Sequence, residues 1–218
     1  MPVDNPQREK KRQRRQTIVD AADTVLKEKG RDAMTMADIA DAAELSRSLL
    51  YVYFEDMDDI VLAVTHRGFR SMRERFEAAA QQHETGRAQI RAIGDAYLQF
   101  SQEEPTRFRL VAQFESRVAD PEDSSERVRQ CLVEADRGLQ VMSTAIRRGI
   151  DDGSIRSTLN PRQAALTLWG STHGLIQLAA TKGGGLEKQY GLDPGSLVDT
   201  GLDFLGRALA DLPAKDLE

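Results

Sequence analysis

The histidines and the single cysteine are the first residues to consider for metal binding or nucleophilic catalysis: His66, His83, His173 and Cys131. The histidines fall on separate segments, and no two of them have the helical spacing with which one face presents two metal ligands. Cys131 has no local pattern typical of a nucleophile, and a single cysteine cannot form an internal disulfide. We therefore expect no metal, no cofactor and no enzymatic activity.

A different chemistry is indicated in the stretch that begins at Thr35. Thr35 followed three residues later by Asp38 is typical of a helix start, because the hydroxyl accepts an unpaired first-turn amide and the acid favours the positive helix end. Apolar residues at one-face spacing follow, and Ser46 can cap a second helix over 47–53. Two short helices joined by a tight turn form a helix-turn-helix, whose second helix fits the major groove of DNA.

Basic residues precede this stretch. The first 15 residues carry six basic side chains and two acidic ones, a net +4, whereas the whole chain has a formal net charge of -5. The total charge alone would argue against nucleic acid, so the distribution matters more. A charged terminus is often only a solvated tail, but ahead of a helix-turn-helix we expect a basic arm that contacts DNA.

The same stretch resembles the DNA-binding signature of the TetR family of one-component transcriptional regulators. The match covers about the first quarter of the chain and rests on Thr35, Asp38-Ile39-Ala40, Leu45-Ser46-Arg47, Leu50-Tyr51 and Tyr53-Phe54. The resemblance implies that Arg47, Ser48 and Tyr51 face base edges, where arginine can bind guanine. It assigns the remaining DNA contacts to Thr35, Ser46, Tyr53 and the arm residues Arg12, Arg14 and Arg15.

Three positions depart from the family pattern. Glu44 stands where a turn glycine is common, Ser48 where a glycine is common, and Met57 where a phosphate-binding lysine opens the next helix. Without that lysine, we expect more of the attraction to the DNA backbone to come from the arm.

The rest of the chain has apolar residues at helical spacing, with neither strand-period alternation nor a glycine-rich nucleotide-binding pattern. The spacings predict helices over about 13–29, 56–82, 90–103, 105–114, 128–149, 161–183 and 194–212, with a turn at 120–124. We expect an all-α protein: an arm (1–11), a three-helix DNA-binding domain with the start of a linking helix (12–71) and a larger helical effector-binding and dimerisation domain (72–218). No apolar run is long enough for a membrane span or a signal peptide, so we expect a cytoplasmic protein.

The last predicted helix carries a heptad seam. Its apolar residues stand four, three, four and three positions apart: Val198, Leu202, Leu205, Leu209 and Leu212. Such a seam fits a dimer interface and an internal core equally well. Gly170 and Gly174, four apart in the preceding helix, call for a close backbone approach. The resemblance favours a homodimer formed by the last two helices, with both glycines in its interface.

The body helices carry more apolar and aromatic residues than a narrow core stripe needs. We expect some of them to line an effector pocket: Tyr97, Phe100, Phe108, Gln113, Phe114, Met142, Trp169 and His173. A core role is the alternative for each, and for His173 it is the commoner one, although pockets do combine apolar walls with a few polar groups.

The resemblance implies a repressor that occupies a palindromic operator as a dimer and is released when a small-molecule inducer binds between the body helices. The alternative is a constitutive or architectural DNA-binding protein without an inducer, in which the body only dimerises.

Overall fold

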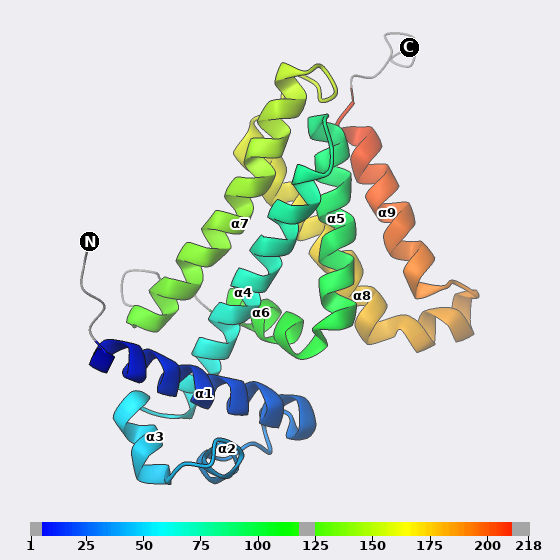
Figure 1. Ribbon diagram of the computed structural model, residues 1–218. Coiled ribbons are helices and arrows are strands. Elements are labelled where there is room, and N and C mark those ends of the chain that lie inside the picture. Colours follow the sequence, from blue (N-terminus) through cyan, green and yellow to red (C-terminus); the bar gives the residue numbers. More distant parts are fainter. Residues whose placement is uncertain (1–5, 118–124, 211–218) are drawn as a thin grey trace, which may run out of the picture. The chain divides into compact units, whose positions relative to one another are not determined.

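The computed structural model describes residues 6–117 and 125–210, and this part of the chain is helical without a strand (Figure 1). Its helices are α1 (Pro6–Lys29), α2 (Met36–Ala42), α3 (Arg47–Tyr53), α4 (Met57–Gln81), α5 (Gly86–Glu103), α6 (Pro105–Arg117), α7 (Glu126–Asp151), α8 (Pro161–Tyr190) and α9 (Pro194–Ala208). The predicted all-α class is confirmed. The turn expected at 120–124 lies outside the described residues. No described helix has the length and apolar character of a membrane span.

Two helix boundaries differ most from prediction, the start of α1 and the end of α8. α1 begins at Pro6 rather than near residue 13, so the described part of the basic arm is helical. Proline suits the first helical turn, and Glu9 pairs with Arg12 one turn later at 2.9 Å. α8 continues through the three glycines 183–185 to Tyr190 and ends at Gly191, whose φ of 65° is the left-handed conformation that glycine favours at a helix end.

The chain divides by contacts into two units. Unit 1 consists of residues up to Phe69 together with 105–132, and unit 2 of 70–104 together with the chain from Val133 onwards. α4 and α7 therefore run through both units. A division into consecutive segments at residue 72 does not anticipate this, because α6 belongs with the N-terminal helices.

Unit 1 has a core that holds its short helices. Ile18 and Leu26 of α1, Ile39 of α2, Leu50 of α3 and Ile60 of α4 are each at most 1% exposed. Helices as short as α2 and α3 are marginal in isolation, so this shared core supplies their stability.

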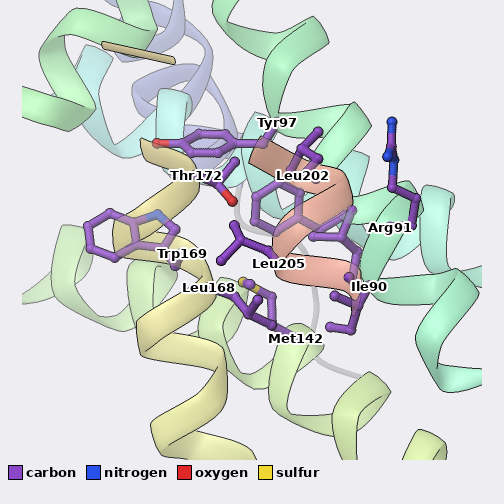
Figure 2. Close-up of a pocket in the computed structure, with 13 residues that line it drawn as sticks. Ile90, Arg91, Tyr97, Met142, Leu168, Trp169, Thr172, Leu202 and Leu205 are labelled. Carbon is purple, nitrogen blue, oxygen red and sulfur yellow. The ribbon is translucent and has the colours of Figure 1, made fainter. Parts of the chain in front are cut away.

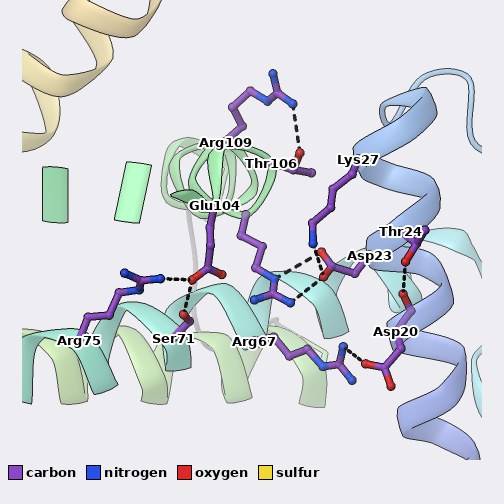
Figure 3. Close-up of polar contacts among 11 residues, drawn as sticks. Asp20, Asp23, Thr24, Lys27, Arg67, Ser71, Arg75, Glu104, Thr106 and Arg109 are labelled. Atoms are coloured by element: carbon purple, nitrogen blue, oxygen red, sulfur yellow. Dashed lines mark hydrogen bonds and ion pairs between the residues drawn. The ribbon is translucent and has the colours of Figure 1, made fainter. Parts of the chain in front are cut away.

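Ion pairs attach α4 and α6 to α1 within unit 1 (Figure 3). Asp23 of α1 is 5% exposed and accepts from Arg107 of α6 at 2.6 Å, with Lys27 3.2 Å away. Arg67 of α4 pairs with Asp20 of α1 at 2.7 Å. A buried carboxylate needs such partners, because desolvating an unpaired charge is costly.

Unit 2 is held together by close helix contacts. Leu202 of α9 packs on Gly94 of α5, and Leu175 of α8 packs on Gly201 of α9. At the end of α5, Glu104 accepts hydrogen bonds from Ser71 at 2.7 Å and Arg75 at 2.9 Å, both on α4 (Figure 3). A side chain at Gly94 would displace Leu202, and a side chain at Gly201 would displace Leu175.

The close approach of Gly86 of α5 to the backbone of Gly149 of α7 predicts a stability difference between two alanine substitutions. A Cβ at Gly86 would lie 2.1 Å from the backbone nitrogen of Gly149, whereas a Cβ at Gly184, inside α8, would meet nothing within 4 Å. We expect Gly86→Ala to lower the free energy of unfolding by about 1–3 kcal/mol, because backbone cannot easily move aside. Gly184→Ala should raise it by about 0.5–1 kcal/mol by restricting the unfolded chain. Urea denaturation measures both, and equal effects would contradict the packing described.

Candidate DNA-binding surface and ligand cavity

The start of α2 is fixed by reciprocal capping. Thr35 Oγ1 accepts from the Asp38 amide at 3.2 Å, and the Thr35 amide donates to Asp38 Oδ2 at 2.8 Å. Lys29 pairs with the same carboxylate at 2.6 Å, and the hydrogen bonds from Lys29 and Thr35 lower the pKa of Asp38 to about 2. Thr35, predicted to contact DNA, therefore also sets where the helix-turn-helix begins.

The turn between α2 and α3 has a left-handed residue. Glu44, at the position where family members commonly have glycine, has a φ of 54°, a conformation that costs a non-glycine residue about 1–2 kcal/mol. Ser46 then caps α3 by accepting from the Leu49 amide at 3.3 Å, and its Oγ lies 3.0 Å from that of Ser48. Both serine hydroxyls therefore already take part in hydrogen bonds at the start of α3.

α3 presents an exposed face. Leu50 is fully buried, whereas Arg47, Ser48 and Tyr51 are exposed. Arg47 and Tyr51, four residues apart, lie on one face of the helix. Val52 is 68% exposed and was not among the residues predicted to contact DNA.

The other predicted DNA contacts have different surroundings. Arg14 is exposed, and Arg12 is paired with Glu9. Arg15 lies over the Phe54 ring at 5.0 Å. Tyr53 is half-buried against the core of unit 1. Of these residues, Arg14 is the one with an exposed side chain for which the structure records no ion pair.

An apolar cavity lies in unit 2 between α5, α8 and α9 (Figure 2). Trp169 and Thr172 of α8 and Leu202 and Leu205 of α9 line it, with Tyr97 of α5. Its volume is about 30 Å³, close to the share of one water molecule in the liquid and well below the roughly 300–1,000 Å³ of common ligand pockets. A larger ligand would therefore have to displace side chains.

His173 positions two walls of this cavity. Its Nδ1 lies 2.6 Å from the Tyr97 hydroxyl oxygen, and its ring stacks on Trp169 with centroids 5.4 Å apart. Burial lowers the pKa of His173, although a hydrogen bond with Gln177 opposes the shift. The neutral ring can then accept or donate at Nδ1, depending on its tautomer.

The eight residues predicted for one effector pocket divide between the units. Tyr97, Met142 and Trp169 line the cavity, whereas Phe100 is buried against Tyr97. Three others belong to unit 1: Phe108 is buried there, and Gln113 and Phe114 line a separate pocket of about 200 Å³. Helical spacing identified buried and lining positions but could not show which helices meet.

Much of the predicted dimer seam is buried within the single chain, and Leu212 lies outside the described residues. Val198, Leu202 and Leu209 are at most 6% exposed in the single chain, so they are core, and Leu205 lines the cavity. A core helix and an interface helix have the same apolar period, so the sequence could not separate the two roles.

The two glycines predicted for the interface have open space around them. A Cβ at Gly170 or Gly174 would meet nothing within 4 Å. Leu166 of the same helix is 50% exposed, and Phe204 of α9 is 66% exposed. These residues are exposed apolar and glycine positions of α8 and α9.

The only cysteine is an inert core residue. Cys131 is fully buried, its thiol lies 3.5 Å from the Leu62 carbonyl oxygen, and burial raises its pKa to about 12. The reactive thiolate is therefore scarce near neutral pH.

The burial of His173 predicts a pH dependence of stability. Because its pKa is lower in the folded chain than the ordinary value of 6.5, the unfolded chain binds the proton more readily, and stability falls as the pH drops below about 6.5. His173→Gln should remove this contribution, which is at most about 1.4 kcal/mol per pH unit. Denaturation between pH 5.5 and 7.5 measures it; parallel curves for the two proteins would contradict the assignment.

Comparisons with known proteins agree with this architecture. Residues 18–64 match bacterial regulatory proteins of the tetR family, and residues 90–205 match the tetracyclin repressor-like C-terminal domain. The fatty acid metabolism regulator protein of Bacillus subtilis (strain 168) is 24% identical over 162 residues, which are 74% of this chain and 80% of that protein.

Solved structures share the fold. The transcriptional regulator FadR from Bacillus subtilis, in complex with stearoyl-CoA, matches with a TM-score of 0.66 and 22% identity over 87% of this chain and 96% of that chain. A protein of unknown function from Rhodococcus sp. RHA1 matches with a TM-score of 0.72 and 21% identity over 91% and 95%. The ketosteroid transcriptional regulator KstR2 of Mycobacterium tuberculosis matches with a TM-score of 0.64 and 15% identity over 91% of this chain and 96% of that chain.

The C-terminal match alone spans more than half of the chain, and the N-terminal match covers the helix-turn-helix. The chain therefore belongs to the tetR family of bacterial regulatory proteins, which are DNA-binding regulators of transcription.

Proposed function

We propose that the protein is a repressor that occupies a palindromic operator as a homodimer and is released by a small molecule bound in the cavity of unit 2. The observation that carries the DNA-binding part is the exposure of Arg47, Ser48 and Tyr51 on α3, a helix that the buried Leu50 holds on the core. A capped helix with its polar face free can enter the major groove.

In this proposal base and phosphate contacts come from different residues. Arg47 binds a base edge, with Ser48 and Tyr51 beside it, because a guanidinium can bind guanine bidentately. Phosphate contacts come from Thr35, Tyr53, Ser46 and first-turn amides, and from Arg12 and Arg14 of α1. Arg15 contributes only if it leaves the Phe54 ring.

The homodimer uses the exposed surface of α8 and α9. Gly170 and Gly174 permit a close helix approach, and Leu166 and Phe204 supply apolar area that a second copy would cover. A two-fold dimer matches a palindrome whose half-sites lie about 34 Å apart, or a multiple of that distance.

The ligand proposed for the cavity has a long apolar chain. The cavity walls are largely aliphatic and aromatic, and the FadR structure from Bacillus subtilis contains stearoyl-CoA. We therefore favour a long-chain acyl-CoA or fatty acid. The small volume supports the alternative of a DNA-binding protein without an inducer, because a ligand must first open the cavity.

A thermal shift assay separates these two functions. A ligand present at 100 times its Kd stabilises the folded chain by about 2.7 kcal/mol, or roughly 5–10 °C for a chain of this size. We expect palmitoyl-CoA to raise the Tm, and CoA without the acyl chain to leave it unchanged. If palmitoyl-CoA, palmitate and a wider metabolite library all fail to stabilise the chain, the proposal that an inducer binds is refuted.

Arg47 is predicted to carry sequence specificity. Arg47→Ala should weaken binding to the operator by about 1–3 kcal/mol and change binding to random DNA little. Arg14→Ala is the control, since loss of a phosphate contact should weaken both complexes equally. Mobility-shift titrations on the two DNAs measure this. Equal losses for Arg47→Ala would place Arg47 on phosphate instead.

The proposed dimer surface predicts that one added carboxylate will separate the two subunits. Phe204→Glu places a carboxylate in the proposed interface and should yield monomers that bind the operator weakly, as light scattering and mobility shift would report. Val133→Glu, at a side chain 51% exposed on α7, is the matched control and should remain dimeric. A dimeric Phe204→Glu variant would move the interface elsewhere.

A further inference from the structure

A second pocket of unit 2 adjoins the apolar cavity. It has a volume of about 330 Å³ and lies between the loop after α7, the first turns of α8 and the end of α9. Leu168 and Leu205 line both this pocket and the cavity, so these two side chains separate them. Figure 2 shows Leu168 and Leu205 beside each other, on α8 and α9.

The second pocket holds an arginine that has no ion-pair partner among the described residues. Arg156 lines the pocket, and its Nε is buried without a hydrogen-bond partner in the described chain. None of the described residues that line the pocket is acidic, and its polar groups include Asn160, Gln163 and Thr167. A buried guanidinium nitrogen without an acceptor is costly, and an anion in the pocket would remove that cost.

The backbone holds Arg156 in place. Its amide donates to the Leu209 carbonyl oxygen at 2.9 Å, at the end of α9. The preceding Ile155 is 2% exposed, and its amide donates to the Gly149 carbonyl oxygen at 2.8 Å. These two hydrogen bonds fix the backbone at Arg156 against the ends of α9 and α7.

The other arginine near the cavity is less suited to an anion. Arg91 lines the cavity, but its guanidinium already pairs with Asp203 and, at 3.1 Å, with Asp95. An anionic ligand there would meet two carboxylates. Arg156 has no such competitor among the described residues.

We propose that Arg156 binds the anionic group of an amphipathic ligand whose apolar chain passes between Leu168 and Leu205 into the cavity beside Trp169. The inference rests on the proposed function, because it assigns the charged end of that same ligand. Arginine suits either source of the charge, since it binds carboxylate and phosphate bidentately. Movement of the two leucines would join the pocket to the cavity and provide the room that the cavity alone lacks.

The test measures ligand binding to the full chain by titration calorimetry and by the fluorescence of Trp169, the sole tryptophan. The probes are palmitate, palmitoyl-CoA and the uncharged hexadecanol, below their micellar concentrations. Arg156→Gln should weaken at least one anionic probe by about tenfold to a hundredfold and leave hexadecanol unchanged. If Arg156→Gln loses affinity for palmitate, the subsite binds a carboxylate. If it loses affinity for palmitoyl-CoA alone, the subsite binds a phosphate.

Two further variants keep the test decisive. Arg156→Lys retains the charge and should retain most of the affinity. Arg147→Gln removes an exposed arginine of α7 and should change no affinity. If Arg156→Gln binds every probe as the parent does, or loses hexadecanol equally, the anion subsite is refuted while the acyl ligand stands. If the parent chain binds no probe, the acyl ligand and the subsite both fail.

Discussion

The buried carboxylate of Asp23 constrains how the DNA-binding helices are held. Only 5% of Asp23 is exposed, so it needs a cation, and Arg107 of α6 supplies one at 2.6 Å. Breaking such a pair by removing one partner commonly costs about 3–5 kcal/mol. α1, which braces α2 and α3, is therefore tied to a helix that follows it by more than 75 residues in sequence.

In the proposed function, a ligand affects DNA binding through the chain that joins α5 to α6. Pro105 opens α6 directly after Glu104, which Ser71 and Arg75 hold at the end of α5. α5 also lines the proposed ligand cavity. A ligand alters DNA affinity only by as much as it prefers one arrangement of these helices, and about 1–3 kcal/mol would suffice.

The sequence predicted local features better than long-range ones. The caps at Thr35 and Ser46 and the all-α class follow from side-chain chemistry and spacing within one helix, and the structure has them. The ion pair of Asp23, the pocket around Arg156 and the split of the predicted pocket depend on which helices meet. The seam of α9 was ambiguous because core and interface share one period, and in the single chain Leu202 is buried.

In the proposed function, an amphipathic ligand in unit 2 weakens DNA binding by the helix-turn-helix. Fluorescence anisotropy of a labelled operator, titrated with the dimer at increasing palmitoyl-CoA, measures this coupling most directly, with Trp169 fluorescence reporting occupancy in the same samples. The account predicts that the Kd for the operator rises by about 5-fold to 150-fold as the site fills. A Kd for DNA that stays constant while Trp169 reports a saturated site would contradict it.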